Sequence, residues 1–205
     1  MIEIQITELP YHCRTKDLLW FSETRQVVDM LIKEDRSFED IKKLADQENL
    51  FNAASASRSK DIRQAIGRRI AAVDNDFLQV FVQQNTTMQK ILCLTMLMLT
   101  DRTFYEFMDH IFREKLISGN DILKDSDLFG FLHSIQAKDP KAAKWTDVGM
   151  RKARTNYKQI LKDAGLTTDE LNDRKLLKPI LSKPVDDLFR TSGLEPVRKI
   201  LTGER

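Results

Sequence analysis

The chain contains 205 residues, of which 41% are hydrophobic and 31% are charged, and its formal net charge is +2. This composition is typical of a folded globular protein and excludes an intrinsically disordered chain. The length fits one domain or two small, closely packed domains. The small net charge carries no argument for nucleic-acid binding, so any such argument must rest on local clusters of charge.

Two cysteines and one uncharged segment bear on the compartment. Cys13 and Cys93 stand alone, without the paired spacing of a zinc or redox site, which is typical of a reducing cytosol. The first residues lack the basic segment and the continuous apolar run of a signal peptide. Residues 91–100 are uncharged, but a membrane span needs about 20 such residues. We therefore expect a cytoplasmic protein that does not enter a membrane.

The first forty residues predict one short strand and the start of two helices. Isoleucines alternate with polar residues over positions 2–6, as in a short strand. Helical spacing of apolar residues predicts a helix over 22–34, with Ser22 as its N-cap. Ser37 and Asp40 have the spacing of a capping box and predict that a second helix begins at Ser37.

Residues 56–73 form the segment on which the functional interpretation depends. Their apolar residues share one narrow helical face, which predicts a helix with one buried side. Between positions 55 and 73 five bases face one acid, Asp61, and serines crowd the N-terminal end, where free backbone N–H groups favour anions. A solvated surface helix is the plain alternative, because Lys and Arg are ordinary surface residues.

The helix that starts at Ser37 and the basic helix together resemble a helix-turn-helix unit over residues 37–73. In such motifs the second helix enters the major groove of DNA with its N-terminus first. Two packed helices without a DNA-binding role are the generic alternative. The serine and arginine content at the start of the second helix favours DNA.

The middle of the chain predicts a buried central helix, followed by a boundary between two subdomains. Apolar residues surround a helix that begins near Thr86, so this helix must be central. Asp101 is the expected cap of the next helix, which runs to about Ile117. The break at 118–120 predicts an N-terminal subdomain over 1–118 and a C-terminal one over 119–205.

The second half repeats the arrangement of the first. A short apolar helix near 126–135 is followed by a basic helix over 145–164, so residues 126–164 form a second helix-turn-helix-like unit. Asp147 is the only acid between Lys141 and Lys162. The tail predicts a capping box at 167–170 and short helices near 175–182, 184–191 and 195–202. The whole pattern predicts an all-α, compact globular protein with two helix-turn-helix-like units around a central apolar helix.

No pattern in the sequence indicates catalysis. There is no Gly-rich phosphate loop, His-Glu-x-x-His motif, nucleophile elbow or paired-cysteine metal site. Residues 125–130 imitate the start of a calcium loop, but Phe129 takes a ligand position and Gln136 replaces the terminal glutamate, so we reject a metal site there. We expect a protein that is not an enzyme and has no cofactor, metal or small-molecule substrate.

The order of these segments resembles the BrxA family, a small component of the bacteriophage exclusion (BREX) defence systems of bacteria. The segments that carry the resemblance are the helix over 22–34, Ser37–Ile41, Glu48–Asn49, Ser55–Arg69, the apolar central helix, the basic helix that starts at Trp145, and the Leu- and Pro-rich tail. The resemblance implies an all-helical protein with helix-turn-helix elements that binds double-stranded DNA. It also implies action beside other BREX proteins, including a DNA methyltransferase.

The leading hypothesis is therefore a non-enzymatic protein that binds double-stranded DNA mainly through phosphate contacts. The expected contact residues are Arg58, Lys60, Arg63, Arg68, Arg69, Lys144, Arg151, Lys152, Thr155 and Lys158. A protein-interaction scaffold, whose basic faces dock acidic partner subunits, is the rival hypothesis. RNA binding by the same helices is a third, and the absence of an aromatic stacking platform among the basic residues argues against it.

Overall fold

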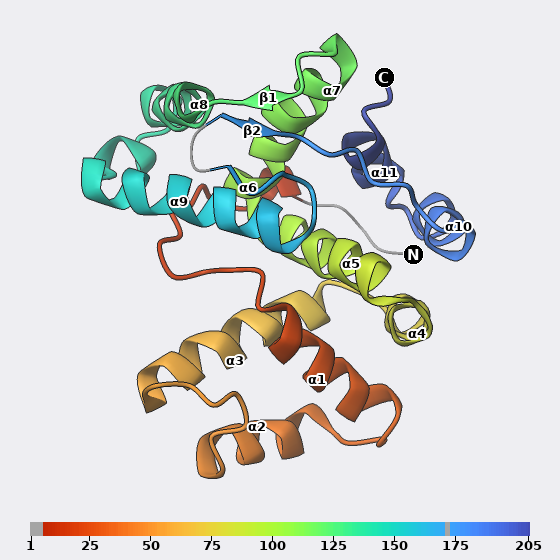
Figure 1. Ribbon diagram of the computed structural model, residues 1–205. Coiled ribbons are helices and arrows are strands. Elements are labelled where there is room, and N and C mark those ends of the chain that lie inside the picture. Colours follow the sequence, from red (N-terminus) through yellow and green to blue (C-terminus); the bar gives the residue numbers. More distant parts are fainter. Residues whose placement is uncertain (1–5, 171–172) are drawn as a thin grey trace.

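The computed structural model describes residues 6–170 and 173–205 and has helices as its main elements (Figure 1). Its N-terminal part comprises a 3₁₀ turn η1 (Ile6–Glu8) and helices α1 (Phe21–Ile32), α2 (Phe38–Gln47), α3 (Ala56–Ala71), α4 (Asn75–Gln83) and α5 (Thr86–Met98). One long helical stretch follows, made of α6 (Arg102–Phe107), a π-helical turn η2 (Met108–Arg113) and α7 (Glu114–Ser118).

The C-terminal part adds two very short strands to the helices. Its elements are β1 (Ile122–Leu123), α8 (Asp125–Lys138), a 3₁₀ turn η3 (Ala142–Lys144), α9 (Asp147–Asp163), β2 (Arg174–Lys175), α10 (Lys183–Thr191) and α11 (Glu195–Thr202). β1 and β2 pair antiparallel, with Ile122 opposite Lys175. Within the described residues, strand pairing is limited to these two-residue strands and one isolated bridge. The predicted all-α class is therefore confirmed.

Side-chain caps begin several helices where the sequence predicts them. The Ser37 hydroxyl accepts a hydrogen bond from the Asp40 N–H, and the Asp101 carboxylate accepts one from the Phe104 N–H. At the end of α7, Gly119 takes the left-handed conformation that terminates helices. The predicted helix starts at Ser37 and Asp101 and the break after Ser118 are confirmed.

Three local predictions are wrong, and most of a fourth lies outside the described residues. The cap of α1 is Trp20, in a left-handed conformation, and Ser22 lies inside the helix. No helix forms over 175–182, because this segment pairs with β1 and then runs extended to α10. No helix begins at 167–170, because Thr167 bridges to Leu176 instead. Most of the strand predicted over 2–6 lies outside the described residues, and Ile6 belongs to η1.

Two clusters of buried side chains organise the fold. The larger one surrounds α5, where Leu92, Cys93 and Leu94 are fully buried, and it draws side chains from both sides of residue 119. The predicted subdomain boundary at residues 118 and 119 therefore remains a prediction. The smaller cluster joins α1, α2 and α3 into a three-helix unit that occupies the lower part of Figure 1.

None of the helices in the described part of the chain combines the length and the apolar character that a bilayer span requires.

Candidate nucleic-acid interface

Helix α3 begins with a serine cap and presents its N-terminal half at one side of the molecule. The Ser55 hydroxyl accepts a hydrogen bond from the Arg58 N–H at 3.2 Å. Ile62, Ala65 and Ile66 are buried against α1 and α2, which leaves Lys60 on the exposed face. The predicted division of this helix into an apolar and a basic side is therefore present in the structure, except at its C-terminal end.

Arg69 is the exception, because it was expected to contact DNA and the structure buries it. Its side chain is buried, and its guanidinium donates to the carbonyls of Leu18 and Leu19, each at 2.7 Å. Trp20 packs against the same guanidinium. Burial lowers the pKa of Arg69. Because residues 18–20 cover Arg69, we leave it out of the candidate interface.

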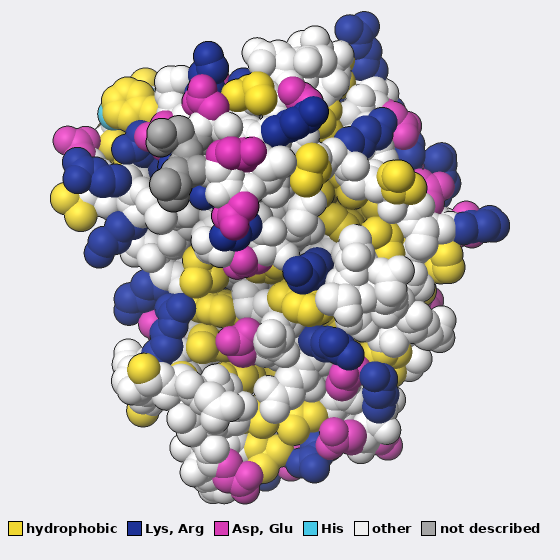
Figure 2. All heavy atoms as spheres, in the orientation of Figure 1, with side chains coloured by type: hydrophobic (Ala, Val, Ile, Leu, Met, Phe, Trp, Pro, Cys, Tyr) yellow, Lys and Arg dark blue, Asp and Glu magenta, His cyan; other side chains and the backbone are white. Residues whose placement is uncertain are grey.

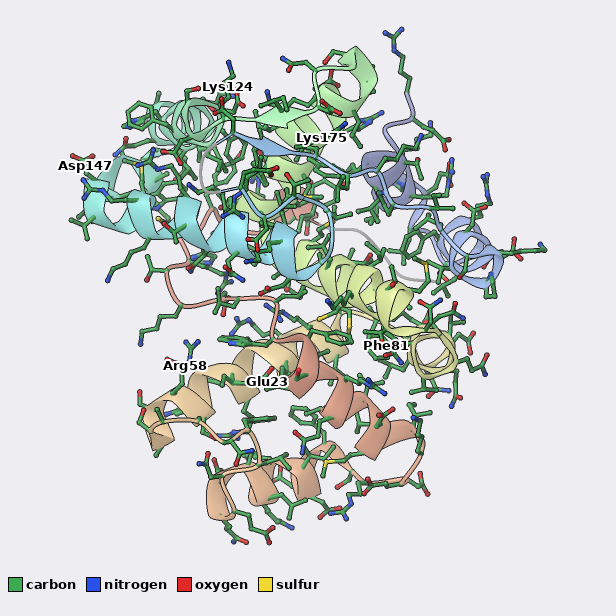
Figure 3. The ribbon with its side chains drawn as sticks, viewed as in Figure 1. Glu23, Arg58, Phe81, Lys124, Asp147 and Lys175 are labelled. Carbon is green, nitrogen blue, oxygen red and sulfur yellow. The ribbon has the colours of Figure 1, made fainter. Side chains whose placement is uncertain are left out.

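The other arginines of α3 are exposed to different degrees. Arg63 is 15% exposed and pairs with Asp46 of α2 at 3.3 Å, so it mainly joins the two helices. Arg68 is 43% exposed and pairs with Asp17 at 3.2 Å. Arg58 lies over the Trp20 ring at 5.1 Å and donates to the Lys16 carbonyl at 3.2 Å. In Figure 3 Arg58 lies on the side of α3 that faces α9.

The segment of residues 11–20, which we name the strap, runs between the three-helix unit and the rest of the molecule (Figure 1). On one side Lys16 pairs with Asp61 of α3 at 3.2 Å. On the other side the His12 N–H donates to the Thr103 hydroxyl at 2.9 Å, and Asn156 of α9 donates to the Arg14 carbonyl at 3.5 Å. The strap therefore contacts both basic helices.

Lys16 is a candidate contact residue that sequence reasoning missed. Its side chain is 70% exposed, whereas that of its ion-pair partner Asp61 is 31% exposed. The segment around it shows no helical period, and its single lysine carries no charge pattern. Only the tertiary position of the strap, between α3 and α9, gives Lys16 a place among the other cations.

Helix α9 also starts at a capped N-terminus and is basic on its exposed face. The Thr146 hydroxyl accepts from the Gly149 N–H at 3.1 Å. The buried face consists of Met150, Ala153, Tyr157, Ile160 and Leu161. On the opposite side lie Arg151, Lys152 and Thr155, all exposed, and Lys144 is exposed in the preceding turn η3. The predicted face of this helix is thus in place.

Two cations of α9 are held by a carboxylate of α8. Arg154 and Lys158 contact the two oxygens of Asp125 at 2.8 and 2.9 Å, and their side chains are 17% and 20% exposed. These contacts lower the pKa of Asp125, the hydrogen bond from Lys158 being the largest cause. Lys158, which was expected to contact DNA, is therefore a neutralised member of the candidate interface.

Strap and helices together form one positively charged side, which we name the basic edge. The N-terminal ends of α3 and α9 lie toward the same side of the molecule in Figure 1, and Figure 2 shows Lys and Arg side chains gathered there. The pKa of His12 is lowered, first by burial and then by Arg14 of the strap, Arg68 of α3 and Lys141, the residue before η3. The basic edge consists of Lys16, Arg58, Lys60, Arg68, Lys141, Lys144, Arg151 and Lys152.

The connections inside the two helix pairs differ from a short helix-turn-helix turn. Residues 48–55 join α2 to α3, and residues 139–146 join α8 to α9, whereas the turn of the motif has three or four residues. The first connection is ordered by Asn49, whose side chain exchanges hydrogen bonds with the backbone of Ala53 at 2.9 and 3.1 Å. Both helix pairs are therefore helix-turn-helix-like, and the DNA-binding motif itself remains a proposal.

Metal-ligating side chains do not gather at the basic edge. In residues 6–170 and 173–205 no group of three His, Cys, Asp or Glu side chains has an arrangement that could hold a metal ion. The carboxylates of the rejected calcium-loop pattern serve the fold, since Asp127 accepts from the Lys124 N–H at 2.7 Å and Asp125 binds α9.

Comparison with known proteins identifies the family of this sequence and a solved structure that shares its fold. The BrxA family model matches residues 11–193. The chain is 31% identical over 186 residues to the BREX protein BrxA of Bacillus cereus (strain H3081.97), covering 91% of this chain and 92% of that protein. A crystal structure of an uncharacterized protein from Magnetospirillum magneticum superimposes with a TM-score of 0.78 at 18% identity, covering 95% of this chain and 99% of that one, and shares the fold. The chain belongs to the BrxA family of BREX proteins.

Proposed function

We propose that this protein is a non-enzymatic accessory component of a bacterial BREX phage-defence system and that it binds double-stranded DNA along the basic edge. One observation carries the proposal: the strap contacts both basic helices, and the capped N-terminal ends of these helices lie toward one side of the molecule. Backbone N–H groups at helix N-termini and Lys and Arg side chains are the groups that contact DNA phosphates.

Phosphate contacts account for most of the proposed binding. The exposed members of the basic edge are mainly Lys and Arg, which bind phosphates without reading sequence. Thr155 lies among them on α9, and its hydroxyl, which donates to the Arg151 carbonyl at 3.1 Å, can donate to a phosphate only by giving up that bond. The residues expected to contact DNA are therefore Lys16, Arg58, Lys60, Arg68, Lys141, Lys144, Arg151, Lys152 and Thr155. Arg63 and Lys158 are partly buried cations of the same two helices whose charges are already paired with Asp46 and Asp125.

The proposed protein partners follow from the similarity to a named BREX protein. The relative in Bacillus cereus is named a BREX protein, and we propose other BREX proteins, among them a DNA methyltransferase, as the proteins beside which this one acts in the cytoplasm. The scaffold hypothesis differs in one measurable respect. It requires complexes with acidic partner subunits that persist when the protein has no affinity for DNA.

Salt-titrated binding tests the proposal. Affinity for a labelled duplex, for each of its single strands and for a hairpin RNA is measured by fluorescence anisotropy over a range of salt concentrations. We expect tightest binding to the duplex, with a log–log salt slope of about −0.9 for each phosphate neutralised. Binding that prefers RNA, or no binding to the duplex at low salt, would contradict it.

A further inference from the structure

A groove between α8 and α9 lies next to the basic edge and shares Arg151 with it. It has a volume of about 370 Å³ and opens to solvent. Helix α8 provides one wall and the N-terminal half of α9, marked by Asp147 in Figure 3, provides the other. The groove is lined by Phe129, Leu132, His133, Asp147, Met150, Arg151 and Arg154.

The floor of the groove is apolar and its rim exposes an aromatic ring. Leu132 and Met150 are buried at the floor, at 0% and 4% exposure. Phe129 is 51% exposed, although it belongs to a helix whose other large apolar residues, such as Phe131, are buried. Phe129 and the apolar floor together give the groove a surface against which an apolar group of another molecule can pack.

The α9 wall gives the groove its charge preference. Arg151 is exposed and has no ion-pair partner among the residues that the structure describes. Arg154 lies with its guanidinium 5.4 Å from the centre of the Phe129 ring and pairs with Asp125. Asp147 is the one acid in the lining, and it is also the only acid among seven bases between positions 141 and 162. Because Asp125 already pairs with Arg154, Arg151 is the lining cation that remains to bind a carboxylate of a ligand.

The contacts of Phe129 favour an apolar side chain over a nucleobase in this groove. The His133 ring lies 4.1 Å from the Phe129 ring, centre to centre, and the Arg154 guanidinium lies near the same ring. A base stacks best on an open aromatic face, and these two neighbours already occupy part of the face of Phe129. A leucine or phenylalanine side chain needs only the apolar floor and the ring edge.

We propose that this groove is a docking site for an acidic peptide segment of a partner protein, whose bulky apolar side chain enters between Phe129 and Met150 while its carboxylates reach Arg151. This site goes beyond the DNA-binding proposal and does not depend on it. Arg151 belongs both to the groove and to the basic edge, so an acidic segment in the groove also competes with DNA for that side chain.

The test uses a defined probe and the full chain. A blocked peptide of sequence Glu-Leu-Glu-Phe-Asp-Glu is titrated into ¹⁵N-labelled protein, and amide shifts are followed by NMR. We expect shifts concentrated at Phe129, His133 and residues 147–154. Phe129→Ala and Arg151→Gln should each weaken binding, Phe129→Ala by about tenfold. Ile180→Ala removes another exposed apolar side chain, 90% exposed, at a distant position and should leave binding unchanged.

Three outcomes would overturn the proposal. They are no binding of the acidic peptide at millimolar concentration, equal binding of a peptide with all acids changed to glutamine, and shifts that do not move with Phe129→Ala. A short single-stranded oligonucleotide that occupies the groove more tightly than the peptide would also overturn it. Because Phe129→Ala leaves every cation of the basic edge in place, its duplex DNA affinity should stay unchanged, which separates this test from that of DNA binding.

Discussion

Asp125 of α8 accepts a hydrogen bond from Arg154 of α9 at 2.8 Å, and the same carboxylate contacts Lys158 at 2.9 Å. One acid thus neutralises two cations next to the basic edge while remaining 53% exposed. The same relationship recurs between Asp17 and Arg68, with the acid on the strap. Carboxylates therefore limit how much positive charge this side offers to phosphate.

Removing the Asp125 charge should strengthen DNA binding. In Asp125→Asn, Arg154 and Lys158 lose their carboxylate partner and become available to phosphates. We expect a tighter complex at low salt and a salt slope that is steeper by about 0.9 for each additional phosphate contact. The measurement is duplex affinity against salt concentration. The matched control is Asp187→Asn, which removes an exposed acid from its ion pair with Lys183. It should change the slope little. Unchanged affinity in Asp125→Asn would show that DNA does not reach this part of α9.

The two basic helices should contribute separately to DNA binding. Arg58→Gln with Lys60→Gln neutralises the α3 side, and Arg151→Gln with Lys152→Gln neutralises the α9 side. We expect each pair to weaken binding only partly, because the other helix retains its charge, and we expect the combined variant to lose most affinity at physiological salt. Anisotropy titrations measure both effects.

The control for those variants removes the same charge elsewhere. Lys178→Gln with Lys183→Gln neutralises two exposed lysines of the C-terminal part and should leave the salt slope unchanged. If the α3 pair alone abolished binding, the two helices would not form one interface. If the control weakened binding as much as either pair, the effect would be one of net charge and not of the basic edge.

Local signals in the sequence predicted most helices, and the errors arise where distant segments decide the structure. Ser37 and Asp101 cap helices with hydrogen bonds to residues three positions on, so their role is visible in the sequence. The extended run over 175–182 follows from pairing of Lys175 with Ile122, which lies far away in the sequence. No local pattern contains that contact.

In the candidate interface, too, some residues could be predicted from local sequence patterns and others depend on distant segments. The exposed face of α9 follows from its helical period, and Arg151 and Lys152 lie where the period predicts. Arg69 lies on the border of the apolar stripe of α3, and its burial depends on carbonyls that the strap brings from 50 residues away in the sequence. Lys16 enters the interface for the same reason. The strap has no pattern of its own, so neither its path nor its contacts could be predicted.

Arg69 should contribute to stability and not to DNA binding. Arg69→Met keeps a long side chain but removes the donors to Leu18 and Leu19, and leaves their carbonyls without those partners. We expect the free energy of unfolding to fall by about 2–4 kcal/mol. Urea denaturation followed by circular dichroism measures it. Arg68→Met, the exposed neighbour, is the matched control and should cost less than about 1 kcal/mol.

The outcome separates a structural role from a binding role. Folded Arg69→Met, assayed well below its unfolding midpoint, should bind duplex DNA with a salt slope close to that of the unmodified protein, since a buried guanidinium contacts no phosphate. A loss of slope without a loss of stability would restore Arg69 to the interface.

Asp101 should make stability depend on pH between its unfolded and folded pKa values. It is 4% exposed, and burial raises its pKa from 3.8 to about 6, although Arg14 at 3.2 Å and backbone hydrogen bonds act in the opposite direction. Between those values the folded state binds more protons than the unfolded state, so the free energy of unfolding falls as pH rises through this window. The fall should be at most about 2–3 kcal/mol.

Two variants test this assignment. Asp101→Asn keeps an N-cap acceptor for the Phe104 N–H but cannot titrate, so its stability should lack this fall. Urea denaturation is repeated from about pH 4 to about pH 7, the range over which such a carboxyl titrates. Arg14→Met removes the cation that favours the charged carboxylate, which raises the folded pKa and should extend the fall to higher pH. Arg14 is part of the strap and pairs with Asp101, the N-cap of α6. Arg14→Met therefore also tests whether this ion pair is needed to hold the strap in place. A stability curve of Asp101→Asn that runs parallel to that of the unmodified protein would assign the pH dependence to other groups.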